Sequence, residues 1–193
     1  VVGDVEMSYE LTGNGPPVVL VAGTGYPGRT WLPAAVAALA AEFTVVTFDH
    51  RGTGDTAETQ VPYSTRLFAA DALGLVDSLG LERVHVIGHS MGGRVAQWMA
   101  LDAPERVRTL VLAATGAGRP PSDAQQDLPA HVRDGLAELG YQQYMSRHQR
   151  ETFFNESFAR KNPDVVEWLD NAFWSGRPKL DVYVRHVLAR QGH

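Results

Sequence analysis

Short, continuous apolar runs separated by helical patterns are the feature that most constrains the fold of this chain. Each run has the length and composition of a strand buried on both faces. The runs are VVLVA at 18–22, TVVTF at 44–48, VHVI at 84–87 and RTLVLAA at 108–114. An earlier strand is expected from Val5 to Leu11, where apolar and polar residues alternate.

Helix signals fill the intervals between these runs. One helix is expected over about 31–41, and another from an N-cap at Ser64 to Leu79, where Gly80 can end it. A third should run from about 91 to Asp102. Strands that alternate with helices indicate a mostly parallel sheet with helices on both faces, so the predicted fold class is α/β.

The character of the chain changes at TGAGRPPSD (115–123), a linker rich in glycine and proline. No strand pattern follows it. Apolar stripes with helical spacing lie instead over 132–139, closed by Gly140, then over 163–173 and 180–187. We therefore expect an α/β core over 1–116 and a helical region rich in aromatic residues over 117–193.

The stretch Gly88-His89-Ser90-Met91-Gly92 matches the G-x-S-x-G nucleophile elbow, with a buried strand before it and a helix after it. A serine in so sharp a turn takes strained backbone dihedrals, and the residues two positions away must be almost free of side chain. The helix that follows directs its N-terminal N–H groups toward the site. The pattern predicts a nucleophilic Ser90, with the N–H of Met91 as one oxyanion donor.

Three further segments resemble the same protein family as this motif does. PPVVLVAGTGYPGRTW, FDHRGTGDT and ALDAPERVRTLVLA resemble segments of the α/β-hydrolase superfamily. Within it, the chain is most similar to the group of 3-oxoadipate enol-lactonases, esterases and cofactor-free haloperoxidases. The resemblance implies that the helical region is a cap over the active site. Ser90 stands where related dehalogenases and epoxide hydrolases carry an aspartate, which argues against those activities.

The resemblance also implies a second oxyanion N–H in the loop after the first buried strand. Relatives carry His-Gly there, and this chain has Ala22-Gly23 followed by Thr24-Gly25-Tyr26-Pro27. The donor is Thr24 if Gly23 is the equivalent glycine, or Tyr26 if Gly25 is. The continuous strand favours Thr24, and the Tyr-Pro pair favours Tyr26.

The acid and the base of a catalytic triad are not found in the sequence. In this family they follow the serine in the order Asp or Glu, then His, each after a further strand. The later histidines are His131, His148, His186 and His193, all in the expected cap or at its end. We therefore expect a chain that lacks the C-terminal strands of the fold. The strand over 108–114 would then leave an open apolar edge, which favours self-association.

The composition of the chain disfavours several classes of binding partner and cofactor. The net charge is −5 without a dense cluster of Lys or Arg, which disfavours nucleic acids and anionic membranes. There is no cysteine, and no apolar run is long enough to span a bilayer. The start of the chain lacks the pattern of a signal peptide. We expect a cytoplasmic protein without a metal or an organic cofactor.

The function predicted from these features is hydrolysis of a carboxylic ester or lactone through an acyl-enzyme on Ser90, with the site incomplete in this chain. Two alternatives stay open. One is a non-catalytic hydrolase-fold fragment that binds a small apolar ligand or a completing partner chain. The other is C–C bond hydrolysis or a cofactor-free peroxidase reaction on the same scaffold. Asp49 and Arg51 are interpreted as residues that fix the loop after their strand, and Trp31 as core.

Overall fold

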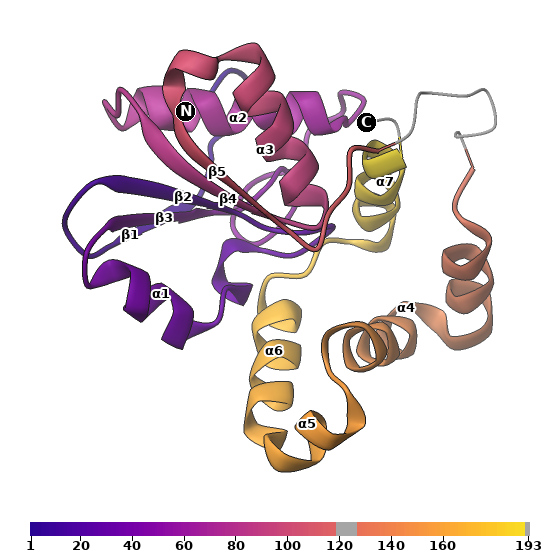
Figure 1. The fold of residues 1–193 in the computed structure, drawn as a ribbon. Helices are drawn as coiled ribbons and strands as arrows, with labels where there is room; N and C mark the ends of the chain where they lie inside the picture. Colours follow the sequence, from indigo (N-terminus) through magenta and orange to yellow (C-terminus); the bar gives the residue numbers. More distant parts are fainter. Residues whose placement is uncertain (119–126, 192–193) are drawn as a thin grey trace.

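A computed structural model describes residues 1–118 and 127–191. Its centre is a sheet of five strands in the order β1-β3-β2-β4-β5. Their bounds are Tyr9–Thr12 for β1, Pro17–Val21 for β2, Thr44–Phe48 for β3, Val84–His89 for β4 and Val107–Ala113 for β5. Only β1 runs antiparallel to its neighbour, and the other pairs are parallel. The chain thus has the predicted α/β fold (Figure 1).

The apolar runs form strands where the sequence predicts them, whereas the first strand is shifted. The predicted strand over 5–11 is replaced by β1 at Tyr9–Thr12, and an isolated bridge joins Val2 to Val5. Val5 and Met7 are buried in the core cluster without belonging to the sheet. Their alternation therefore reflects burial of one face of an irregular segment rather than strand pairing.

The two faces of β2 are covered by different helices. Val19 and Val21 pack in the main core with α2 (Thr65–Ser78) and α3 (Met91–Asp102). Val18 and Leu20 face the other way, toward α1 (Pro33–Ala40). This two-sided burial is the reason for the unbroken apolar run, and Figure 1 shows α1 on one side of the sheet and α2 and α3 on the other. As predicted, the side chain of Ser64 caps α2 by accepting a hydrogen bond from the N–H of Leu67.

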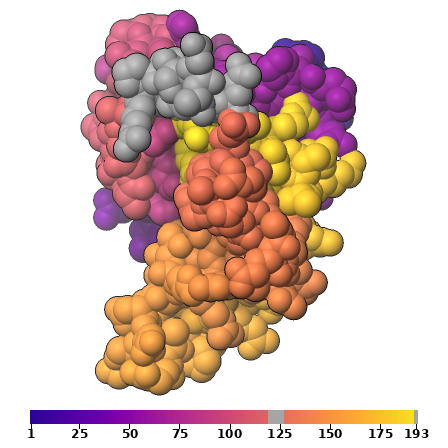
Figure 2. Space-filling model, turned by 90° about the vertical axis from the view of Figure 1, so that its right-hand side faces the viewer, coloured from indigo at the N-terminus to yellow at the C-terminus, as the bar shows by residue number. Residues whose placement is uncertain are grey.

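The part of the chain after residue 127 is helical. It consists of α4 (Ala130–Phe153), α5 (Glu156–Lys161), α6 (Pro163–Ser175) and α7 (Leu180–Gln191). The predicted stop at Gly140 is a kink, with φ of 72°, and the helix resumes beyond it. The segments α4 to α6 project from the sheet-bearing part of the molecule (Figures 1 and 2).

The last helix returns to the core. Ala189 of α7 is part of the main core cluster, and the side chain of Val182 lies against Gly52 in the loop after β3. The division into 1–116 and 117–193 remains a prediction, and α7 contacts residues on both sides of it.

The strand β5 forms one edge of the sheet. It pairs with β4 on one side only, and Val111 and Leu112 are 49% and 44% exposed. Leu101, on the neighbouring helix α3, is also exposed. The described residues therefore leave an apolar strip along β5 that no other element covers.

Candidate active site

Ser90 sits at the junction between β4 and α3. Its backbone has φ of 55° and ψ of −119°, a conformation that residues with a side chain rarely adopt. Apart from Ser90, the only described residue other than glycine with a positive φ is Ala114. The chain thus makes the strained strand-to-helix turn that the G-x-S-x-G pattern predicts.

The glycines around Ser90 are required by close backbone contacts. A Cβ atom on Gly88 would lie 2.4 Å from the carbonyl oxygen of Gly92. One on Gly92 would lie 2.1 Å from the carbonyl oxygen of Val21. Neither position can accept a methyl group without moving the backbone, so the motif is a steric requirement of this turn.

The end of β5 is hydrogen-bonded to the turn at Ser90. The N–H of Ser90 donates to the carbonyl of Ala113 at 2.9 Å, and the hydroxyl of Thr115 donates to the carbonyl of Ser90 at 2.7 Å. Both backbone polar groups of Ser90 are therefore committed to hydrogen bonds within the protein. The role of Thr115 is not visible in the sequence, because no local pattern links it to residue 90.

The loop after β2 lies against Ser90. A Cβ atom on Gly23 would lie 3.4 Å from the Cβ of Ser90, so this loop passes directly beside the serine. The N–H of Tyr26 already donates to the carbonyl of Gly23 at 3.2 Å. Among the described residues, nothing accepts a hydrogen bond from the N–H of Thr24. Of the two predicted oxyanion donors in this loop, Thr24 has the available N–H.

Met91 provides the other predicted donor. It is the first residue of α3 and is completely buried. N–H groups in the first turn of a helix have no partner within the helix, and they lie at the positive end of its dipole. The N–H of Gly93 bonds to the carbonyl of Ser90, whereas that of Met91 has no acceptor among the residues described.

No histidine or carboxylate among the described residues makes a hydrogen bond to the Ser90 side chain. His131 is exposed, and His148 stacks on Tyr144 at 5.8 Å. His89 packs edge-on against Trp31 and beside Phe153. His193 lies outside the described residues.

His186 is buried on α7, together with His50 in the loop after β3. The Nε2 atom of His186 lies 2.8 Å from the carbonyl oxygen of Arg51, and that of His50 lies 3.3 Å from the carbonyl oxygen of Ala22. Burial lowers the pKa of His50 to about 3 and that of His186 to about 4. Both rings are therefore neutral at pH 7, and they join α7 to the core.

The loop after β3 is fixed by Asp49 and Arg51. The carboxylate of Asp49 accepts hydrogen bonds from the N–H groups of Gly28 and Asp55 at 2.7 and 2.9 Å. Arg51 makes a bidentate, buried ion pair with Asp71 on α2. These contacts confirm the interpretation of both residues as loop anchors.

An apolar cavity of about 320 Å³ lies beside the turn. One side of its wall comes from the core, from the end of β2 and the loop after it, from residues 30–32 and from His89. The other side comes from α4, α5, α6 and the connection between α4 and α5. The lining residues are Ala22, Gly23, Tyr26, Thr30, Trp31, Leu32, His89, Phe153, Phe154, Phe158, Val165, Trp168 and Leu169. Trp31 packs against the core cluster, as predicted, and also lines this cavity.

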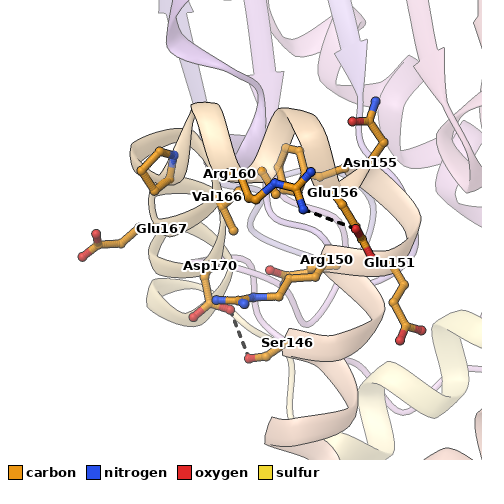
Figure 3. Close-up of a pocket in the computed structure, with 13 residues that line it drawn as sticks. Ser146, Arg150, Glu151, Asn155, Glu156, Arg160, Val166, Glu167 and Asp170 are labelled. Atoms are coloured by element: carbon orange, nitrogen blue, oxygen red, sulfur yellow. Dashed lines mark hydrogen bonds and ion pairs between the residues drawn. The ribbon is translucent and has the colours of Figure 1, made fainter.

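A second hollow lies entirely within the helical region, between α4, α5 and α6 (Figure 3). It is lined mainly by polar and charged side chains, including Arg150, Glu167 and Asp170. Ser146 donates to Asp170 at 3.2 Å, and Arg160 pairs with Glu156 at 3.5 Å. Most residues that line this hollow are polar or charged, whereas none of those that line the apolar cavity is Asp, Glu, Lys or Arg.

The family follows from comparison with known proteins. The model of the α/β hydrolase fold family matches residues 16–184. The chain belongs to this family. The match covers strands β2 to β5, the serine turn and most of the helical region, which fits the strand order and the turn geometry described above.

Relatives within the family carry several names. The chain is 41% identical over 110 residues to "Putative carbamate hydrolase RutD" of Azorhizobium caulinodans, covering 57% of this chain and 41% of that protein. It is 42% identical over 112 residues to "Putative non-heme bromoperoxidase BpoC" of Mycobacterium tuberculosis, covering 58% and 42%. The chain thus spans about two fifths of the length of these curated relatives.

A solved structure covers more of the chain. The enol-lactonase of Burkholderia xenovorans LB400 matches with a TM-score of 0.81 at 25% identity, over 98% of this chain and 72% of that one. In residues 1–118 and 127–191, no helix is long and apolar enough to cross a membrane.

Proposed function

We propose that the complete site hydrolyses a carboxylic ester or lactone through an acyl-enzyme on Ser90. The observation that carries this proposal is the backbone of Ser90, held at φ of 55° between a strand end and a helix start. Strain of this kind is retained when it serves a functional geometry. Here it places Ser90 against the loop after β2 and at the start of α3, where the N–H groups of Thr24 and Met91 have no acceptor among the described residues.

In the proposed reaction, the Oγ of Ser90 bonds to the carbonyl carbon and gives up its proton to a base. The carbonyl oxygen becomes an oxyanion, which the N–H groups of Met91 and Thr24 stabilise. The bond to the leaving alcohol then breaks, the alcohol takes up the proton, and water cleaves the acyl-enzyme. Tyr26 is the less favoured donor, because its N–H is already bonded to Gly23.

The base and the acid that orients it lie, in this proposal, outside the residues that the structure describes. A serine hydroxyl is a weak nucleophile without such a base. We therefore expect this chain to acylate slowly and to turn over activated esters slowly or not at all. A small-molecule ester or lactone is the proposed substrate, without a nucleic acid or membrane partner.

The test is acylation by p-nitrophenyl acetate, followed by peptide mass spectrometry. We expect an acetyl group on Ser90 of the wild type and none at that site in Ser90→Ala. Equal release of p-nitrophenol by both proteins, well above the buffer rate, would contradict the role of Ser90.

A second candidate is a non-catalytic fragment that binds a small apolar ligand or a completing partner chain. It is favoured by the lack of a hydrogen-bonded base on Ser90 among the described residues and by the uncovered edge of β5. C–C bond hydrolysis or a cofactor-free peroxidase reaction needs the same serine geometry. The relative named as a bromoperoxidase keeps that reaction as a further alternative.

A further inference from the structure

The apolar cavity begins next to the proposed nucleophile. Gly23 and His89 both line it, and each is in immediate proximity to Ser90: His89 precedes it in the chain, and Gly23 faces its Cβ. A group bonded to a carbonyl at Ser90 can therefore extend into this space. The volume of about 320 Å³ is at the small end of the range for small-molecule pockets.

Aromatic rings make up most of the cavity wall. Trp31 comes from the core side, while Phe153, Phe154, Phe158 and Trp168 come from the helical side. Tyr26 packs edge-on against Phe153 with ring centroids 5.6 Å apart. Walls of this kind favour an apolar group, and edge-to-face contacts favour a flat ring.

Among the residues that the structure describes, this wall contains no group that carries a charge at neutral pH. None of the lining residues is Asp, Glu, Lys or Arg. Burial lowers the pKa of His89, so its ring is neutral at pH 7. Burial raises the pKa of the Tyr26 hydroxyl, which keeps it protonated. A carboxylate placed here would lose part of its hydration without gaining a cation among the lining residues.

We propose that this cavity binds an uncharged apolar group of the size of a phenyl ring, and that it selects neutral, ring-bearing esters or lactones over substrates with a carboxylate. The assignment rests on the proposed function for its link to Ser90. Binding in the cavity itself does not need the serine, because Ser90 is not part of the wall.

Two adjacent valines on α6 provide matched variants. Val165 lines the apolar cavity, and Val166 lines the polar hollow of Figure 3. Both are half-buried and belong to the same helix. Val165→Phe should fill the cavity, whereas Val166→Phe adds the same bulk outside it.

The probes are 4-phenyl-2-butanone and 3-phenylpropanoate, which differ by a methyl group in place of a charged oxygen. Binding is measured by tryptophan fluorescence, since Trp31 and Trp168 line the cavity, and by the rise in Tm. We expect the ketone to bind at least about tenfold more tightly than the anion. Val165→Phe should weaken ketone binding by about tenfold or more, and Val166→Phe should leave it unchanged.

Equal binding of ketone and anion, or equal effects of the two phenylalanine variants, would overturn the inference. Ser90→Ala, with a fluorophosphonate probe on the wild type, separates the two proposals. Ketone binding retained in Ser90→Ala without probe labelling of the wild type would support the cavity and contradict the nucleophile. Labelling of Ser90 without selective ketone binding would support the nucleophile and contradict the cavity proposal.

Discussion

The residues around Ser90 show how a local pattern translates into geometry. The positive φ of Ser90 and the close contacts at Gly88 and Gly92 follow from the three fixed letters of the G-x-S-x-G pattern, because the two glycines leave room for the turn. The site could be predicted to this extent. Thr115, which bonds to the carbonyl of Ser90, could not be predicted, because it lies 25 positions away and depends on how β5 ends.

Gly92→Ala tests the steric requirement directly. The added methyl group would lie 2.1 Å from the carbonyl oxygen of Val21, so the backbone must move. We expect the free energy of unfolding in urea to fall by about 1–3 kcal/mol. Gly116→Ala is the control, because a Cβ there meets nothing within 4 Å, and it should change stability by less than about 0.5 kcal/mol. Equal effects of the two variants would contradict this account.

The sequence predicts a helix or strand correctly where the pattern comes from that element itself. It predicts wrongly where burial of one face of an irregular segment produces the same pattern. The runs that became β2, β3 and β4 are apolar because other elements cover both faces of these strands, and that signal is visible in composition, whereas no residue of β5 is fully buried. Val5 and Met7 alternate with polar residues yet form no sheet strand. The continuation of α4 beyond Gly140 was also missed, because a glycine with positive φ is both a stop and a kink.

The docking of α7 on the core was not predictable, since amphipathic spacing does not say which surface a helix meets. The contact includes His186, buried against the aromatic rings of Tyr63 and Phe68 and beside His50. Its Nε2 atom contacts the backbone carbonyl of Arg51, and the positive charge of Arg185 also acts on its ring. Burial is the main reason that the pKa of His186 is lowered; the charge of Arg185 lowers it further, whereas the hydrogen bond to the Arg51 carbonyl acts in the opposite direction.

This contact predicts acid sensitivity. The folded pKa values of about 4 for His186 and about 3 for His50 lie below the value near 6.5 of an unfolded chain. Below about pH 6.5 the unfolded chain therefore binds protons that the folded chain does not. The contribution of the two histidines to the free energy of unfolding should be fully present above about pH 6.5. It should fall as the pH decreases, by about 2 kcal/mol per histidine between pH 7 and pH 5.

His186→Gln keeps a donor for the Arg51 carbonyl and removes the titration. We expect the loss of unfolding free energy between pH 7 and pH 5 to shrink by about 2 kcal/mol in this variant. His131→Gln, at an exposed position, should leave that loss as in the wild type. A pH dependence that is the same in both variants would contradict the assignment.

At the scale of the whole molecule, the sheet has two edges with different properties. β1 has four residues, whereas β5 has seven and carries the exposed Val111 and Leu112. Unpaired backbone groups next to apolar side chains form a template for pairing with another chain. We propose that the chain self-associates through β5.

Sedimentation velocity over a range of concentrations tests this proposal. The wild type should show concentration-dependent association, and Leu112→Lys should shift it toward the monomer. Leu11→Lys, on the opposite edge and 52% exposed, is the matched control and should leave association unchanged. A wild type that stays monomeric throughout, or equal effects of the two lysines, would count against the proposal.

The most direct test of the central claim is the rate at which a fluorophosphonate probe labels Ser90, compared between folded and urea-unfolded protein. The folded site offers the strained turn and the N–H groups of Met91 and Thr24, which stabilise negative charge even without a full triad. We predict labelling of Ser90 in the folded wild type at a higher rate than in the unfolded chain, and none at residue 90 in Ser90→Ala. Absence of label on folded Ser90, or equal rates in the two states, would contradict the claim that this turn builds a nucleophile.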